Sequence, residues 1–116
     1  MLTEPRTINV LGTEIRVVFL DESKEPKLKD LLGYFDGSKS MIAIKIPKPD
    51  NYSMGDLENV QKECLRHEII HAFLYESGLD GCSGHSECWA TNEEMVDWFA
   101  IQSPKIFKVF REQKLV

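Results

Sequence analysis

Hydrophobic residues in the first part of the chain alternate with polar ones, which is the spacing of β-strands. Residues 7–19 (TINVLGTEIRVVF) are rich in Ile and Val and are interrupted by Leu11 and Gly12. They predict two strands joined by a tight turn, or one bulged strand. Residues 28–32 (LKDLL) suggest a helical turn before Gly33.

A second β-pattern spans residues 34–46, where two β-prone runs flank Asp36 and Gly37. Asp-Gly is a favoured turn pair between strands, so the pattern predicts a hairpin. Alternate residues of a strand point to the same face of a sheet. One face of the second run therefore carries Ile42, Ile44 and Ile46.

Apolar residues of the second part of the chain recur at helical spacing over residues 54–76. Ser53 and Asp56 resemble a capping arrangement at the start of this pattern. Gly78 is a natural left-handed terminator after it. We therefore expect a long, central helix, buried most deeply in its apolar second half.

Residues 79–89 lack a sustained period and predict a loop. A second helix is expected to begin near Thr91 or Asn92, within an acidic sequence. Pro104 is expected to end it, because proline cannot donate a backbone hydrogen bond inside a helix. Residues 105–114 (KIFKVFREQK) then predict a short amphipathic C-terminal helix.

These elements predict an α+β fold in one domain spanning residues 1–116: a small antiparallel or mixed N-terminal sheet packed on the long helix, followed by the acidic helix and the short C-terminal helix. The chain has 116 residues, 42% hydrophobic and 28% charged, which suits one globular domain. Trp89, Trp98 and Phe99 are expected to be core aromatic residues.

Charge and targeting features narrow the partners. The formal net charge of -5 offers no basic surface for neutralising phosphates, so we expect no nucleic-acid partner. No apolar run reaches the roughly 18 residues of a membrane span, and the N-terminus lacks a signal-peptide layout, so we expect no membrane partner and a cytoplasmic location. Three cysteines, an odd number, favour reduced thiols over disulfides.

The chemistry centres on residues 67–71 (HEIIH), an HExxH motif within the predicted helix. Residues four apart lie one above the other on a helix, so His67 and His71 can bind one metal ion. Glu68 is rotated about 100° from His67. It is therefore badly placed as a third ligand in that row but well placed to contact a water on the open side of the ion.

A catalytic zinc ion usually has three protein ligands and one open position. The three-histidine pattern HExxHxxGxxH is excluded because Ser77 stands where its last histidine would be. A carboxylate is the remaining common choice. Glu93 and Asp97 are four apart on the second helix, so one can bind metal while the other accepts the second N–H of a ligating imidazole. This pairing favours Glu93 over Glu94 as the ligand.

HEIIH followed, 22 residues after His71 (93 minus 71), by the NExxxD run at residues 92–97 resembles the gluzincins, the thermolysin-like clan of zinc peptidases. The resemblance implies that Glu93 is the third zinc ligand and that Asp97 lies in the second shell of His67. The wider layout over residues 33–100 is similar to the small ImmA/IrrE-type metallopeptidases of phages and mobile elements, and implies a zincin-like fold. Those proteins place a small residue and Asn or Asp after the ligand, a spacing that EEMVD shifts, so Glu94 stays an alternative ligand.

The resulting hypothesis is a zinc-dependent peptidase acting on a protein or peptide substrate. Zinc lowers the pKa of a bound water, and Glu68 is expected to act as the general base that takes its proton. The alternative is a zinc-stabilised binding or scaffold protein of a phage or mobile element with little turnover. A zinc hydrolase with a non-peptide substrate is the third possibility, since ligands do not fix the substrate.

Three further features are open. Residues 40–46 are either an ordinary strand or a sheet edge to which an extended substrate adds. His85 and Tyr75 are candidates for the transition-state donor. Cys82, His85 and Cys88 form a CxxHxxC sequence that lacks a fourth ligand, so a second metal site there is the less favoured interpretation.

Overall fold

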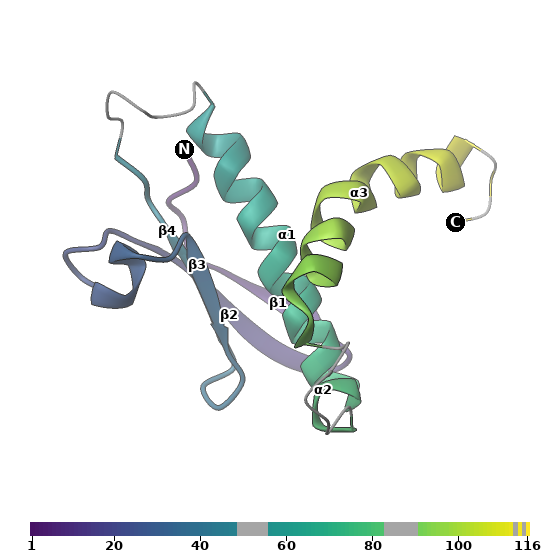
Figure 1. Ribbon diagram of the computed structural model, residues 1–116, viewed down its shortest axis with the longest axis horizontal. Coiled ribbons are helices and arrows are strands. Elements are labelled where there is room, and N and C mark those ends of the chain that lie inside the picture. Colours follow the sequence, from purple (N-terminus) through teal and green to yellow (C-terminus); the bar gives the residue numbers. More distant parts are fainter. Residues whose placement is uncertain (49–55, 83–90, 113, 115) are drawn as a thin grey trace.

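The computed structural model describes residues 1–48, 56–82, 91–112, 114 and 116. These residues form a four-stranded sheet and two long helices, so the predicted α+β class is confirmed (Figure 1). In chain order the elements are β1 (Arg6–Val10), β2 (Thr13–Leu20), the 3-10 turn η1 (Pro26–Lys29), β3 (Gly33–Asp36), β4 (Met41–Lys45), α1 (Leu57–Glu76), α2 (Leu79–Cys82) and α3 (Glu93–Glu112).

The sheet is mixed, with the strand order β1-β2-β4-β3. β1 and β2 form the first predicted hairpin, and their turn residues Leu11 and Gly12 have φ angles of 51° and 94°. Two successive positive φ angles are the geometry that matches the twist of a hairpin. β3 and β4 form the second hairpin, and β4 also pairs in parallel with β2.

The main core lies between one face of this sheet and α1. Ile42 and Ile44 are fully buried in it, and Ile46 packs against it, so the predicted shared face is confirmed. From α1, Leu65 and Ala72 belong to the same cluster. The helix that carries HEIIH is therefore held by the sheet.

β4 is an inner strand, flanked by β2 and β3. The interpretation of residues 40–46 as a sheet edge is wrong. The physical reason is burial on both faces of the strand: Ile42, Ala43 and Ile44 are consecutive and fully buried, a pattern typical of an inner strand. The edge next to β4 is β3.

The long helix α1 ends at Glu76 as expected, and Gly78 follows with a φ of 85°. The predicted start near Ser53 and Met54 lies outside the described residues. Within them α1 begins at Leu57, and the Asp56 side chain accepts a hydrogen bond from the Asn59 backbone N–H.

The buried Gln61 side chain connects α1 to two other parts of the fold. Its oxygen accepts a hydrogen bond from the backbone N–H of Leu2, and its nitrogen donates to the carbonyls of Leu2 and Lys45. A buried amide is stable when its donors and acceptors are satisfied in this way. Gln61 therefore ties the N-terminal segment and the end of β4 to the helix.

The helix α3 begins at Glu93, directly after the predicted start near Thr91 or Asn92, and it continues through Pro104 to Glu112. The separate short C-terminal helix was a wrong prediction. Proline removes only one helical hydrogen bond, and the Ala100 carbonyl that loses this bond accepts one from Arg66 of α1 instead. Figure 1 shows the second half of α3 extending away from α1 and the sheet.

The core assignment of Trp98 and Phe99 is also wrong, because 54% and 44% of their surfaces are exposed. Only a narrow face of α3, with Val96 and Ala100 fully buried, packs on α1. Trp89 and most of the predicted loop lie outside the described residues, although its first four residues form α2. None of the described helices is long and apolar enough to span a membrane.

Candidate metal centre

The histidine half of the site lies on α1, and one face of this helix packs on the sheet. Helical spacing places the rings of His67 and His71 side by side, with centroids 4.9 Å apart and Nε2 atoms 3.2 Å apart. Each side chain is only 18% exposed. HEIIH therefore brings two ring nitrogens together at one point, as the spacing predicts.

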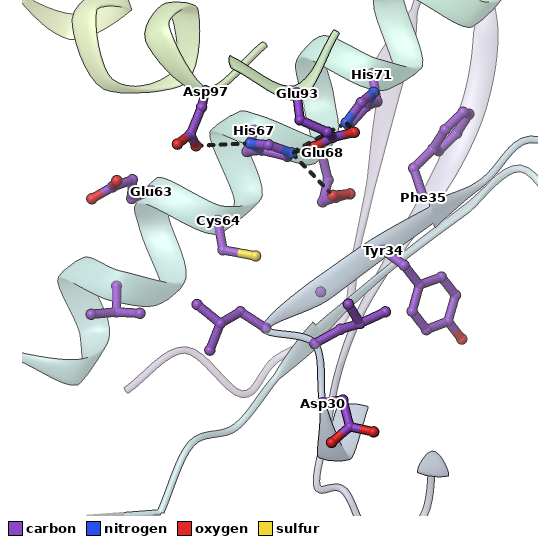
Figure 2. A pocket seen from close by; sticks show the side chains of 14 residues that line it. Asp30, Tyr34, Phe35, Glu63, Cys64, His67, Glu68, His71, Glu93 and Asp97 are labelled. Atoms are coloured by element: carbon purple, nitrogen blue, oxygen red, sulfur yellow. Dashed lines mark hydrogen bonds and ion pairs between the residues drawn. The ribbon is translucent and has the colours of Figure 1, made fainter. Parts of the chain in front are cut away.

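The carboxylate half comes from the first turns of α3. Asn92 caps this helix, because its side chain accepts a hydrogen bond from the Met95 backbone N–H. This cap places Glu93 at the first helical position. Its Oε1 lies 3.0 Å from His71 Nε2 and its Oε2 lies 3.0 Å from His67 Nε2 (Figure 2).

Asp97, one turn further along α3, contacts the other side of the first imidazole. Its Oδ1 lies 3.0 Å from His67 Nδ1. A neutral His67 that donates its Nδ1 proton to Asp97 has a lone pair on Nε2, the atom that faces Glu93. In that tautomer, the Asp97 carboxylate would orient the imidazole so that its free nitrogen points into the site.

The donor set suits a divalent cation. His67 Nε2 and His71 Nε2 are 3.2 Å apart, and each lies 3.0 Å from one of the two Glu93 oxygens. These distances are close to the roughly 3.3 Å between ligand atoms around a tetrahedral zinc ion. At that separation, lone pairs from a carboxylate and neutral imidazoles repel unless protons or a cation lie between them. Two imidazoles and one carboxylate form a common ligand set for catalytic zinc.

Glu68 completes the group, with its Oε1 3.8 Å from His67 Nε2. The ligand atoms of His67, Glu68 and His71 all lie within 4.8 Å of one another, so these three residues could hold a metal ion. Glu93 lies 3.0 Å from each of the two Nε2 atoms, closer than the 3.8 Å between Glu68 and His67, so Glu93 could serve as a third ligand. Burial raises the pKa of Glu68, against the lowering effect of the nearby imidazoles.

A cavity of about 840 Å³ opens beside this group. Residues 30–35, which include most of β3, form one wall, and α1 and the start of α3 form the other. Gly33 makes the close approach of β3 to α1 possible, since a Cβ there would lie 2.8 Å from Cys64 Sγ. Burial raises the pKa of the Cys64 thiol to about 12. Figure 2 shows the two imidazoles and Glu68 on the far side of the cavity from Tyr34.

The remaining predicted residues divide by location. Among the described residues Glu94 forms no hydrogen bond or ion pair with either histidine, so Glu93 rather than Glu94 contacts the imidazoles. Tyr75 packs edge-on against Phe35, with ring centroids 5.5 Å apart, and lines a smaller cavity of about 250 Å³ together with His71.

The CxxHxxC sequence and one of the two donor candidates fall elsewhere. His85 and Cys88 lie outside the described residues, and Cys82 is the last residue of α2. The second metal site and the assignment of a transition-state donor therefore stay predictions.

Sequence reasoning missed one element that lines the cavity and one contact between the two helices that carry the site. The element is β3, which forms part of the cavity wall. Its four residues carry no motif, so its place beside the cavity follows only from its position in the sheet. The contact is made by Arg66, whose Nε donates to the Ala100 carbonyl at 2.7 Å. Pro104 signals that this carbonyl lacks its helical partner, but the sequence does not identify the donor.

No protein-family model, curated protein or solved structure matches this chain.

Proposed function

We propose that this chain is a zinc-dependent peptidase of the gluzincin type, similar to the ImmA/IrrE-type enzymes, that acts in the cytoplasm on a protein or peptide. The observation that carries the proposal is the convergence of three donors from two helices. The Nε2 atoms of His67 and His71 and the carboxylate of Glu93 meet within 3.2 Å. Asp97 keeps His67 in the orientation that this ligand set requires.

Zinc in such a site supplies Lewis acidity, which favours deprotonation of a water molecule and polarises a carbonyl group. Glu68 is the proposed general base, because its Oε1 lies 3.8 Å from His67 Nε2 and borders the cavity. In the reaction, the water oxygen bonds to the carbonyl carbon while Glu68 accepts its proton. The C–N bond then breaks, and Glu68 returns the proton to the departing amine nitrogen.

The cavity supports an extended peptide as the substrate. β3 is the outer strand beside α1, so its outward backbone groups have no strand partner among the described residues. An extended chain can bind such an edge by adding a strand, which would lay its peptide bonds along the wall opposite the two imidazoles. The 840 Å³ of the cavity is sufficient for several side chains.

The decisive experiment measures zinc content and peptide cleavage in the same preparations. We expect the wild-type chain to bind one zinc ion through this site and to cleave members of a peptide mixture, detected by mass spectrometry. The Glu68→Gln variant is expected to retain zinc and to lose about 100- to 10,000-fold in cleavage rate. The matched control is Glu14→Gln, an exposed residue of β2, which is expected to cleave normally.

The outcomes separate the candidate functions. Undiminished cleavage by Glu68→Gln contradicts the proposed base, and absence of zinc binding contradicts the whole proposal. Zinc binding in a wild-type chain that cleaves no peptide favours the alternative, a zinc-stabilised binding protein without turnover.

A further inference from the structure

Pro104 lies inside α3 and leaves one backbone carbonyl of that helix without its usual partner. In an α-helix the N–H of residue 104 would donate to the carbonyl of Ala100, but proline has no N–H. Ala100 is fully buried where α3 packs on α1. A buried carbonyl without a donor destabilises a fold, so another group has to satisfy it.

That group is the guanidinium of Arg66, which comes from the neighbouring helix. Its Nε donates to the Ala100 carbonyl at 2.7 Å, a short distance typical of charge-assisted hydrogen bonds. Among the described residues, Arg66 forms no ion pair with a carboxylate. Its polar contact is therefore made to the backbone of α3, at the carbonyl that Pro104 leaves free.

The contact lies beside the interactions that form the candidate metal centre, and it comes from the residue next to His67 on α1. From the C-terminal end of α1 toward its N-terminal end, three of its residues contact α3 in turn. His71 contacts Glu93, His67 contacts Asp97, and Arg66 contacts Ala100. The numbers rise along α3, so the two helices run antiparallel, and the three contacts follow one another along α3. Arg66 directly precedes His67 in sequence, and Ala100 lies less than one turn after Asp97.

We propose that Arg66 is a positioning residue: its bond to the carbonyl freed by Pro104 fixes the register of α3 on α1 and so holds Glu93 and Asp97 at the two imidazoles. This role rests on the proposed zinc site but not on catalysis. A bond to the backbone sets the position of the helix itself and does not depend on an α3 side chain. Replacing Arg66 should therefore weaken metal binding without touching any ligand.

The test measures metal affinity by competition with a chelator, together with the visible spectrum of the cobalt-substituted protein. Arg66→Met is expected to lower zinc affinity about 10- to 100-fold, the range for residues that orient ligands. It should also change the cobalt bands, because Glu93 shifts. Arg66→Lys, which retains a donor, is expected to recover part of the affinity.

The matched control is Lys62→Met, four residues earlier on the same helix. Lys62 is exposed and pairs with Glu58 rather than with α3, so this variant loses the same charge and should bind zinc within about twofold of wild type. Circular dichroism of every variant without metal verifies that it folds.

Pro104→Ala supplies a second, independent variant. It restores an N–H four residues after Ala100 that competes with Arg66 for this carbonyl, so the bond from Arg66 is expected to weaken. We expect a more stable helix but weaker zinc binding, an outcome that a purely structural role does not produce. In the Pro104→Ala background, Arg66→Met should lower the affinity by less than about threefold, because the coupled contact is already weakened.

Three results would overturn this assignment, and the third also contradicts the proposed function. An Arg66→Met chain that binds zinc as tightly as wild type removes the positioning role and leaves the zinc site intact. An equal effect of Arg66→Met with and without Pro104 shows that the bond to the freed carbonyl is not the cause. A wild-type chain that binds no zinc contradicts the proposed function, and the positioning role falls with it.

Discussion

The two halves of the candidate metal centre are held by very different amounts of surrounding structure. His67 and His71 lie on a helix whose other face packs on the four-stranded sheet, and each is 18% exposed. Glu93 and Asp97 lie on a helix that packs mainly against α1, and they are 69% and 56% exposed. The histidines are thus positioned by the core, whereas the carboxylates are positioned by the docking of one helix.

This difference separates folding from metal binding. Changes in the sheet and in α1 should act on global stability, because burial there is extensive and cooperative. Changes on the exposed surface of α3 should leave the stability of the fold nearly unchanged. Where such changes have an effect, we expect it on metal affinity. The three experiments below test this separation in different parts of the molecule.

The largest expected effect is the loss of core packing in the sheet. Ile44 is fully buried in the core, whereas Ile101 of α3 is 38% exposed. We expect Ile44→Ala to lower the free energy of unfolding by about 3 kcal/mol through the lost burial and the cavity that remains. Ile101→Ala removes the same atoms and should change it by about 0.5 kcal/mol. Urea unfolding of both variants measures the difference, and equal losses would mean that α3 belongs to the same cooperative core.

An intermediate effect is expected at Glu93, the ligand that we propose α3 contributes. Glu93→Gln retains the shape of the side chain but removes the charge that contacts both imidazoles. We expect it to weaken zinc binding at least 100-fold, while the metal-free protein unfolds at nearly the same urea concentration as wild type. Glu94→Gln, next to it in the sequence, is the matched control and should bind zinc normally. The reverse result, with Glu94→Gln losing zinc, would make Glu94 the ligand.

The same contrast explains which features the sequence could predict. The hairpin turn at Leu11-Gly12, the end of α1 at Glu76 and the HEIIH row depend on neighbouring residues, so local patterns predict them. The second hairpin was also predicted, but its turn is residues 37–40, and Asp36 belongs to β3, where it pairs with Met41. The approach of Glu93 and Asp97 to the imidazoles depends on how the two helices dock. The four-residue spacing of these carboxylates indicated that they could contact a histidine, but it did not determine the docking. A family resemblance supplied the pairing of Asp97 with His67.

Three features depended on long-range partners that local patterns do not contain. The place of β3 at the sheet edge follows from the parallel pairing of β4 with β2, which the sequence of β4 alone does not specify. Continuation of α3 through Pro104 required a donor from another helix, Arg66. The exposure of Trp98 reflects how little of α3 is covered, whereas aromatic character alone predicted burial.

The smallest expected effect concerns Cys64, which lies on the α1 wall of the cavity. It tests whether this thiol stays buried in the folded protein when no metal is bound. Burial, and secondarily the charge of Glu68, raises the pKa of Cys64 from 9.0 to about 12. Below pH 9 the thiol is neutral in the folded and unfolded chains and has no effect on their difference. Between pH 9 and 12 the unfolded chain loses this proton while the folded chain retains it, so stability falls as pH rises.

In the presence of a chelator, we expect wild type to lose about 1 kcal/mol more than Cys64→Ala between pH 8 and pH 10 in urea unfolding. Equal losses would mean that the Cys64 thiol is as hydrated in the metal-free folded protein as in the unfolded chain, and that the α1 wall of the cavity does not stay packed without metal.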